Sequence, residues 1–236
     1  MTDLTRFPIT SRWPAQHPDR LQLYSFPTAN GVKASIMLEE IGISYEPHLV
    51  NITQGETRTE EFLSLNPNGK IPAIIDPDGP GGRPLPLFES GAILVYLAEK
   101  SGKLLPSDLA RRYETIQWVF FQVGGIGPFF GQLGYFYKFA GREIEDKRPL
   151  QRFADETRRM LQVLDGRLEG REWIMGDDYS IADIATFGWV RAINAFYEAG
   201  DLVDWGQLSS VPRWLDHGLA RPAVQRGLNI PPRPAG

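Results

Sequence analysis

Cysteine is absent from the 236 residues of the chain. This absence excludes disulfide bonds, a protein thiolate nucleophile and metal sites with cysteine ligands. Histidine is nearly as scarce, with three widely spaced residues at positions 17, 48 and 217, so we expect no structural metal site. Any thiol chemistry on this protein must therefore use a thiol that a small molecule brings.

The net charge is also small, and long apolar runs are lacking. A formal charge of -4 offers no general basic face for nucleic acid, although a local basic pocket for a small anion is compatible with it. No window approaches the roughly 18 uninterrupted apolar residues of a membrane span. Residues 1–20 lack the compact apolar core of a signal peptide. We expect a cytoplasmic protein without membrane or nucleic-acid partners, whose first 20 residues form an extension over the surface.

Residues 21–102 alternate between strand and helix patterns. Residues 21–26 are typical of a short strand, followed by a turn, an amphipathic helix that ends at Gly42 and a second strand. A short helix, two strands joined by the turn "PDGPGGR" and a helix that ends at Gly102 complete the region. The order βαβ followed by ββα predicts a mixed four-stranded sheet, which is a thioredoxin-like α/β domain.

Residues 103–230 carry almost no strand signal and predict an all-helical domain, followed by a C-terminal tail at 231–236. The long helical pattern of residues 107–140 is interrupted at "GGIGP", where clustered glycine and proline predict a break or bend. Ser180 and Asp183 form a capping box that starts a later helix. We interpret this box as structural.

The turn "PTANG" lies at the start of the first long helix. A helix N-terminus has unpaired N–H groups and a partial positive charge, so it stabilises an anion such as an exogenous thiolate. Thr28 and Asn30 are suitable additional donors. Asparagine before glycine is also common in ordinary turns, and this motif alone favours the ordinary turn.

The segment "NPNGKIPAI" places a proline at the start of a strand. If the bond before Pro72 is cis, the peptide groups of Ile71 face outward and can pair with an extended peptide. The alternative is a proline that only initiates the strand. The two interpretations are about equal from this segment alone.

The segment "FESGAI" lies where a strand passes into a helix. Ser90 is an N-cap candidate, and its hydroxyl and N–H can hold a carboxylate while Glu89 accepts from an ammonium group. Together they suit the head group of an amino acid. Capping alone is the commoner role for such residues.

Together, and in this order, these motifs resemble those of cytosolic glutathione transferases over nearly the whole chain. The segments "LQLYSFPTANGVKASIMLEE", "LFESGAILVYLAEK", "WVFFQVGGIGPFFGQ" and "YSIADIA" are most similar to the bacterial Nu class, and similar also to the yeast prion-type relatives. The resemblance implies the glutathione transferase fold, in which a thioredoxin-like N-terminal domain binds glutathione and an all-α domain follows.

The resemblance also implies site residues. Thr28 and Asn30 correspond to the family's thiol-stabilising Thr-x-Asn turn, whereas Tyr24, inside the preceding strand, is expected to pack. Glutathione-binding positions implied by the family pattern are Lys70, Ile71, Glu89 and Ser90, with Gln132 and Arg152 for a second molecule. Alternatively, Gln132 is only an amide on a helix surface and Arg152 only a solvated charge. The family glutamine before the second helix is replaced, with Gln54 or Thr57 as imperfect substitutes.

The implied activity is a glutathione-dependent disulfide-bond reductase, with some transferase or peroxidase activity, that holds two glutathione molecules or one glutathione disulfide per site. Members of this shape form homodimers. One alternative is conjugation, dehalogenation or ether cleavage of an aromatic substrate, with Trp118 and neighbouring aromatic residues lining its pocket. Another is a non-catalytic glutathione-binding regulatory protein.

Overall fold

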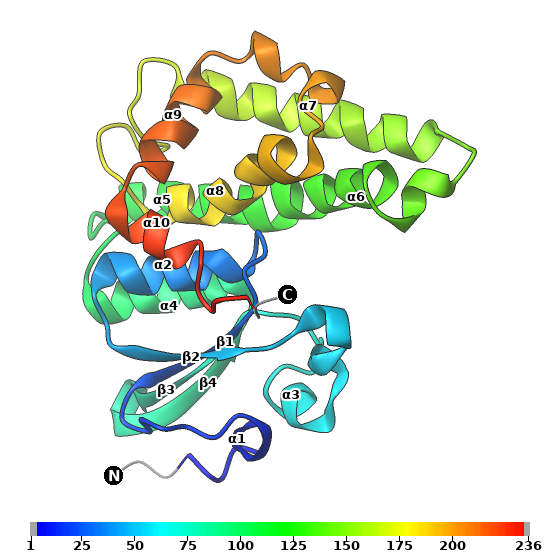
Figure 1. The fold of residues 1–236 in the computed structure, drawn as a ribbon. Coiled ribbons are helices and arrows are strands. Elements are labelled where there is room, and N and C mark those ends of the chain that lie inside the picture. The colour runs from blue at the N-terminus through cyan, green and yellow to red at the C-terminus, as the bar shows by residue number, and fades with distance from the viewer. Residues whose placement is uncertain (1–3, 234–236) are drawn as a thin grey trace. The chain divides into compact units, whose positions relative to one another are not determined.

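The computed structural model describes residues 4–233, which form two compact units. One unit contains residues 4–103 together with 222–233, and the other is Leu104–Arg221 (Figure 1). The segment from Pro222 onward therefore belongs to the first unit, whereas the sequence assigned residues up to 230 to the helical domain. The two units are described separately below.

The first unit is built on a mixed four-stranded sheet with the order β2-β1-β3-β4. β1 runs parallel to β2, and β3 is antiparallel to both β1 and β4. All five residues of β1 are buried, as expected for a central strand covered on both faces. This sheet confirms the thioredoxin-like prediction. The strands are β1 (Leu21–Ser25), β2 (Tyr45–Leu49), β3 (Ala73–Gly79) and β4 (Arg83–Phe88).

Helices cover both faces of the sheet. α2 and α4 lie on one side, whereas α1 and α3 lie on the other (Figure 1). On the second side, Tyr24 and Ala73 of the sheet share a hydrophobic cluster with Phe62 of α3. The elements of this unit besides the strands are α1 (Ile9–Arg12), α2 (Gly31–Ile41), η1 (Ile52–Gln54), η2 (Glu56–Arg58), α3 (Glu60–Leu65), η3 (Pro80–Gly82), α4 (Ser90–Ser101) and α10 (Pro222–Gly227).

The N-terminal extension contributes to the core, although the sequence predicted a segment lying over the surface. Leu4 and Ile9 are buried in the same hydrophobic cluster as Phe62. The indole N–H of Trp13 donates to the Leu49 carbonyl at 2.9 Å. The apolar residues of the extension thus find a surface that the sheet and α3 leave open, and burying them is favourable.

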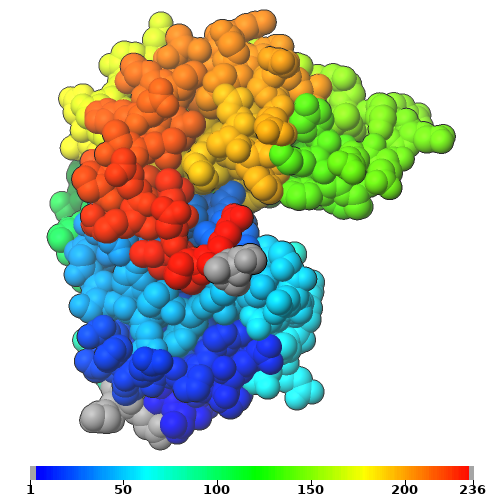
Figure 2. Space-filling view, in the orientation of Figure 1, coloured from blue at the N-terminus to red at the C-terminus, as the bar shows by residue number. Residues whose placement is uncertain are grey.

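The C-terminal segment packs on α2. The Ser35 hydroxyl donates to the Gly227 carbonyl at 2.6 Å, and a Cβ at Gly227 would lie 2.6 Å from the Ile36 nitrogen. Only glycine permits this close backbone approach. Figure 2 shows the segment, in red, against the blue surface of the same unit. This contact explains why residues 222–233 belong to the first unit.

The second unit is helical, as predicted. The segment "GGIGP" does not break the helix: a π-helical turn, η4, joins α5 to α6, and the Gly127 N–H donates to the Gln122 carbonyl. A π turn absorbs extra residues without leaving the helix path. The elements are α5 (Leu109–Phe121), η4 (Gln122–Ile126), α6 (Gly127–Tyr137), η5 (Ala140–Glu143), α7 (Arg148–Leu168), α8 (Ile181–Ala192), η6 (Ile193–Tyr197), η7 (Asp201–Val203), η8 (Trp205–Gln207) and α9 (Ser210–Leu219).

Asp183 is the polar centre of this helical unit, and the predicted capping box is confirmed. Its carboxylate accepts from the Ser180 N–H at 3.0 Å and, at 2.9 Å each, from the Ile174 N–H and the Trp214 indole. Asp183 is fully buried. Burial raises its pKa to about 6, although the hydrogen bonds lower it. One residue therefore connects the start of α8 to α9 and to the preceding loop.

Candidate functional site

Strand register brings four connecting segments to one edge of the sheet. Ala73, the first residue of β3, pairs with Tyr24 near the end of β1 and with Phe88 at the end of β4. β2 ends beside β1, because Leu49 pairs with Ser25. The segments that follow β1, β2 and β4, and the one that precedes β3, therefore emerge together. They contain the site residues of the first unit that the sequence predicted.

The first segment is the turn that starts α2. Thr28 Oγ1 accepts from the Gly31 N–H at 3.2 Å, which leaves the hydroxyl hydrogen of Thr28 able to donate. Asn30 is the N-cap residue of α2, yet its side chain makes no capping hydrogen bond. A Cβ at Gly31 would lie 1.9 Å from the Phe26 carbonyl oxygen, so this tight turn requires glycine. The Val32 and Lys33 N–H groups donate to the Thr28 and Asn30 carbonyls at 3.0 and 3.3 Å. The turn therefore presents the partial positive charge of the α2 N-terminus at the sheet edge, with these N–H groups already paired.

The second segment is the loop that enters β3, and the Ile71–Pro72 bond is cis. The Asn66 side chain donates to the Lys70 carbonyl at 2.6 Å and fixes the loop. Within residues 4–233, the peptide N–H and C=O of Ile71 make no hydrogen bond. This peptide can pair with an extended ligand as an added strand does. The Lys70 side chain is exposed beside it.

The third segment is the corner between β4 and α4. Glu89, not Ser90, is the N-cap residue, and its side chain makes no capping bond; the prediction that Ser90 caps the helix is wrong. Ser90 is the first residue of α4, and its hydroxyl oxygen accepts from the buried Lys33 amine at 3.2 Å. Glu89 has a positive φ of 72°. Because neither side chain caps the helix, both can serve a ligand.

The fourth segment follows β2 and contains both residues proposed as substitutes for the family glutamine, which lie in different environments. Gln54 is exposed at the end of η1, whereas Thr57 is buried in η2. The main chain of Thr57 and the guanidinium of Arg58 lie against Gly69, since a Cβ there would be 3.0 Å from the Thr57 carbonyl and 2.8 Å from Arg58 Nη1. Thr57 is thus the substitute nearer the loop that contains Lys70.

Arg58 is a candidate site residue that the sequence did not lead us to predict. Its guanidinium has no hydrogen-bond or ion-pair partner among the residues the structure describes, so a cation is available close to Lys70. Two cations suit a ligand carboxylate. The sequence signal that could have indicated Arg58 is a positive charge in a loop before a ligand-binding strand. The short distance between Arg58 and Gly69 arises only in the fold.

Gln132 and Arg152 belong to the helical unit. Gln132 is exposed on α6, between Phe129 and Phe136 in the chain. Arg152 is exposed on α7, and its guanidinium lies 3.4 Å from the Glu156 carboxylate. The next residue, Phe153, stacks on Phe136 with ring centroids 5.5 Å apart. The two polar side chains therefore belong to one pair of packed helices and are both accessible.

Tyr24 packs inside the sheet. It is fully buried and stacks on His48 with ring centroids 4.6 Å apart. Burial, with the nearby Glu46 carboxylate, raises the pKa of Tyr24, which makes this phenol a poor anion. Among residues 4–233 its hydroxyl finds no hydrogen-bond partner. Tyr24 thus has the packing role that its place in the strand predicts.

Replacing Tyr24 by phenylalanine should leave catalysis unchanged. The change removes a buried hydroxyl without a partner, so we expect the melting temperature to stay the same or rise, by an amount equivalent to about 1 kcal/mol. Thermal melts and disulfide-reduction assays of Tyr24→Phe check this. A large fall in turnover with an unchanged melting temperature would give the hydroxyl a catalytic role.

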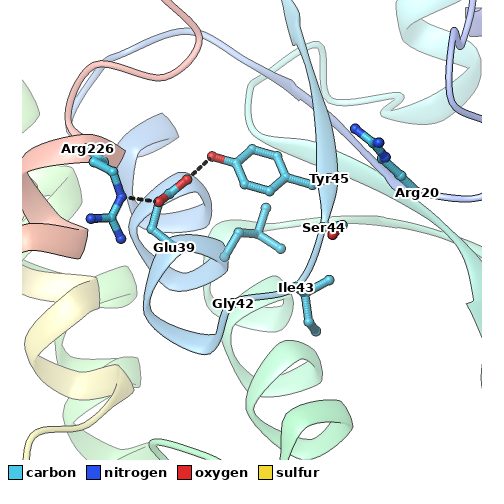
Figure 3. A pocket seen from close by; sticks show the side chains of 8 residues that line it. Arg20, Glu39, Gly42, Ile43, Ser44, Tyr45 and Arg226 are labelled. Carbon is cyan, nitrogen blue, oxygen red and sulfur yellow. Dashed lines mark hydrogen bonds and ion pairs between the residues drawn. The ribbon is translucent and has the colours of Figure 1, made fainter.

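A shallow hollow of about 360 Å³ lies at the opposite edge of the sheet, near the start of β2 (Figure 3). Two of its charged residues pair with each other: the Glu39 carboxylate accepts from Arg226 Nε at 2.6 Å, and also from the Tyr45 hydroxyl at 2.8 Å. This pair fastens α10 to α2. Among residues 4–233, no cluster of metal-ligating side chains occurs, and no helix has the length and apolarity to cross a membrane.

Comparison with known proteins identifies two domains. The model of the N-terminal domain of glutathione S-transferases matches residues 19–99, and that of the C-terminal domain matches residues 131–222. The disulfide-bond oxidoreductase YfcG of Escherichia coli is 42% identical over 209 residues, which cover 88% of this chain and 94% of that protein.

Solved structures of similar proteins contain glutathione. A glutathione transferase from Burkholderia graminis with two glutathione molecules per subunit has a TM-score of 0.97 and 66% identity, covering 99% of this chain and 97% of that one. A glutathione transferase from Pseudomonas putida with one glutathione disulfide per subunit has a TM-score of 0.96 and 61% identity, covering 98% and 100%. The chain belongs to the glutathione S-transferase family.

Proposed function

We propose that the protein is a glutathione-dependent disulfide-bond reductase. One observation carries this proposal: in a chain without cysteine, the N-terminus of α2, the loop before β3 and the corner before α4 emerge at one edge of the sheet. The proposal is supported by the similarity to YfcG, which is named a disulfide-bond oxidoreductase, and to transferases solved with glutathione or its disulfide.

The residues at this edge fit the chemical parts of glutathione. The γ-glutamyl end carries a carboxylate and an ammonium group, for which Ser90 and Glu89 are suitable partners. The middle of the tripeptide is an extended peptide, which matches the unpaired backbone of Ile71. The glycyl carboxylate suits the cations of Lys70 and Arg58, with Thr57 beside them. Gln54 lies in the same loop and is the more exposed substitute.

The turn at the start of α2 stabilises the ligand thiolate. The partial positive charge of the helix N-terminus favours the anion, the Asn30 side chain and the Thr28 hydroxyl act as donors, and we assign catalytic roles to these two residues. Donors worth about 2 kcal/mol lower a thiol pKa of ~8.5 by about 1.5 units. Glutathione is consumed as a substrate: two molecules are oxidised to glutathione disulfide while one disulfide is reduced to two thiols.

Further assignments rest on the same family. We propose that Gln132 and Arg152 hold the second glutathione molecule, for which their accessibility on α6 and α7 is support. We also propose a cytoplasmic homodimer of the Nu class. Light scattering of the purified protein at several concentrations tests the dimer, and a monomer at all of them would refute it.

Two substrates distinguish the reductase from a conjugating enzyme. We expect faster glutathione-dependent reduction of bis-hydroxyethyl disulfide than conjugation of chlorodinitrobenzene or cleavage of an aromatic ether. Efficient conjugation with little disulfide reduction would overturn the proposed reaction but keep the glutathione site. Glutathione binding without turnover of any substrate would indicate the non-catalytic alternative.

One observation favours conjugation as the second candidate: exposed aromatic rings gather near the end of α6, and an apolar acceptor would suit them. The rings of Phe139 and Phe196 lie 5.9 Å apart. Trp118, expected in such a pocket, packs edge-on against Phe121 with ring centroids 5.5 Å apart. The exposed rings are Tyr135, Tyr137, Phe139 and Phe196.

Ser90→Ala should weaken glutathione binding. The variant removes a hydroxyl donor to the γ-glutamyl carboxylate, and a hydrogen bond to a charged group of this kind corresponds to a roughly 10-fold rise in Kd. Calorimetric titration measures it. Ser101→Ala, at the other end of α4, is the matched control, since its hydroxyl donates only within its own helix. Equal affinity in both variants would remove Ser90 from the site.

A further inference from the structure

Lys33 is a charged residue in the first turns of α2, yet only 1% of its surface is exposed. Its amine donates to the Ser90 hydroxyl oxygen at 3.2 Å. Burying an ammonium group is costly, and an apolar side chain of similar length would fill the space without that cost. A lysine at this position therefore has a role besides packing, and its contact with Ser90 indicates which one.

The charge on Lys33 changes near neutral pH. Burial lowers the pKa of Lys33 to about 7, and the Glu89 carboxylate raises it partly back. β1, which packs against α2, has no charged residue in its sequence LQLYS. The other charged groups on α2 and on the helices packed against it do not face Lys33. Glu39 pairs with Arg226, and Lys100 pairs with Asp76. Glu40 and Glu99 lie at the far ends of α2 and α4.

The two protonation states of Lys33 act differently on Ser90. An ammonium group has only donors, so the Ser90 oxygen accepts and the hydroxyl hydrogen must turn elsewhere, where it can donate to a ligand. A neutral amine has a lone pair that can accept the Ser90 hydrogen. In that state the hydrogen is turned away from the ligand. Protonated Lys33 thus prepares Ser90 to bind an anion.

We propose that Lys33 is a positioning residue for the γ-glutamyl carboxylate of glutathione: its buried amine orients the Ser90 hydroxyl as a donor and makes binding depend on pH. This inference rests on the proposed function, because it takes Ser90 as part of the glutathione receptor. A bound carboxylate adds negative charge near Lys33 and favours the ammonium form. Binding should therefore take up a proton near neutral pH.

S-methylglutathione is the probe, because its sulfur cannot ionise. We expect wild-type protein, titrated by calorimetry in two buffers of different ionisation enthalpy, to take up a proton on binding. Its affinity should fall roughly 5- to 10-fold as the pH rises from about 6 to about 8.5. Lys33→Met should bind roughly 10-fold more weakly at the lower pH, with no such dependence and no proton uptake.

A double-mutant cycle separates positioning from a general structural effect. Adding Lys33→Met to Ser90→Ala should weaken binding no further. Lys33→Gln, which keeps a neutral donor, should recover part of the affinity without the pH dependence. Lys103→Met is the matched control, because this exposed lysine donates to the Ile41 carbonyl at 2.9 Å. We expect wild-type binding from it.

The outcomes distinguish two failures. If wild-type protein does not bind S-methylglutathione, the proposed function fails. If wild-type protein binds but Lys33→Met and Lys33→Gln keep its proton uptake, or if the Lys33 and Ser90 effects are additive, the positioning role alone is refuted. Thermal melts show that each variant is folded, and Lys33→Met should melt no lower than wild type, since it removes a buried charge.

Discussion

Asn30→Ala is expected to lower kcat/KM for glutathione-dependent disulfide reduction roughly 10- to 100-fold, because losing a donor to a thiolate costs about 1.5–3 kcal/mol. The Asn30 side chain makes no capping hydrogen bond, so the variant removes no cap from α2. The measurement is the initial rate with bis-hydroxyethyl disulfide over a range of glutathione concentrations. Thermal melts of the variant accompany it.

The pH dependence shows whether Asn30 acts on thiolate formation. Above a pH of about 8.5 free thiols ionise without help, so the deficit of Asn30→Ala should shrink as the pH rises toward that value. Asn229→Ala is the control, because this exposed amide only donates to Gln225 within its own segment. Wild-type turnover by Asn30→Ala, or a deficit that is constant with pH, would contradict the assigned role.

Asp183→Ala is expected to destabilise the protein by about 3–5 kcal/mol, because it leaves several buried donors without an acceptor. The donors are the peptide groups of Ile174 and Ser180 and the indole of Trp214. Asp183→Asn keeps one carbonyl oxygen, which can accept from Ile174 and Trp214. Its stability should therefore lie between those of wild type and Asp183→Ala. Urea denaturation followed by tryptophan fluorescence gives the unfolding free energies. Equal stability of all three proteins would refute this role.

The same residue predicts a pH dependence with a definite sign. Burial raises the pKa of Asp183 in the folded protein from 3.8 to about 6. The folded state then binds the proton more tightly than the unfolded state. Its contribution to stability is fully present below the unfolded pKa and is lost as the pH rises through the folded value. The stability gap between wild type and Asp183→Ala should therefore widen as the pH falls from about 7 to about 4.

The fold and the family could be predicted from the sequence because their signals are local. The alternation of β1 and α2, the turn residues between β3 and β4 and the capping box at Ser180 each depend on neighbours in the chain. These patterns fix the order of elements, and strand order then brings Thr28, Ile71 and Glu89 to one edge of the sheet. The site follows from topology.

The features that the sequence did not reveal depend on contacts between distant residues. Ser90 is bonded to Lys33 across 57 positions, which explains why a residue that looked like a helix cap has another role. Arg58 reaches Gly69 only because its loop folds back. Residues 222–233 join the sheet-containing unit through Gly227 and Ser35, which are 192 positions apart. No local pattern encodes such distances.

The central claim is that a borrowed thiol is ionised at the start of α2. The ultraviolet absorbance of thiolate, recorded against pH for glutathione bound to wild-type protein and to Asn30→Ala, tests it most directly. We expect the wild-type complex to titrate about 1.5 units below a free-thiol pKa of ~8.5, and the variant to titrate closer to that value. A bound thiol that titrates at or above the free value in wild-type protein would contradict the claim.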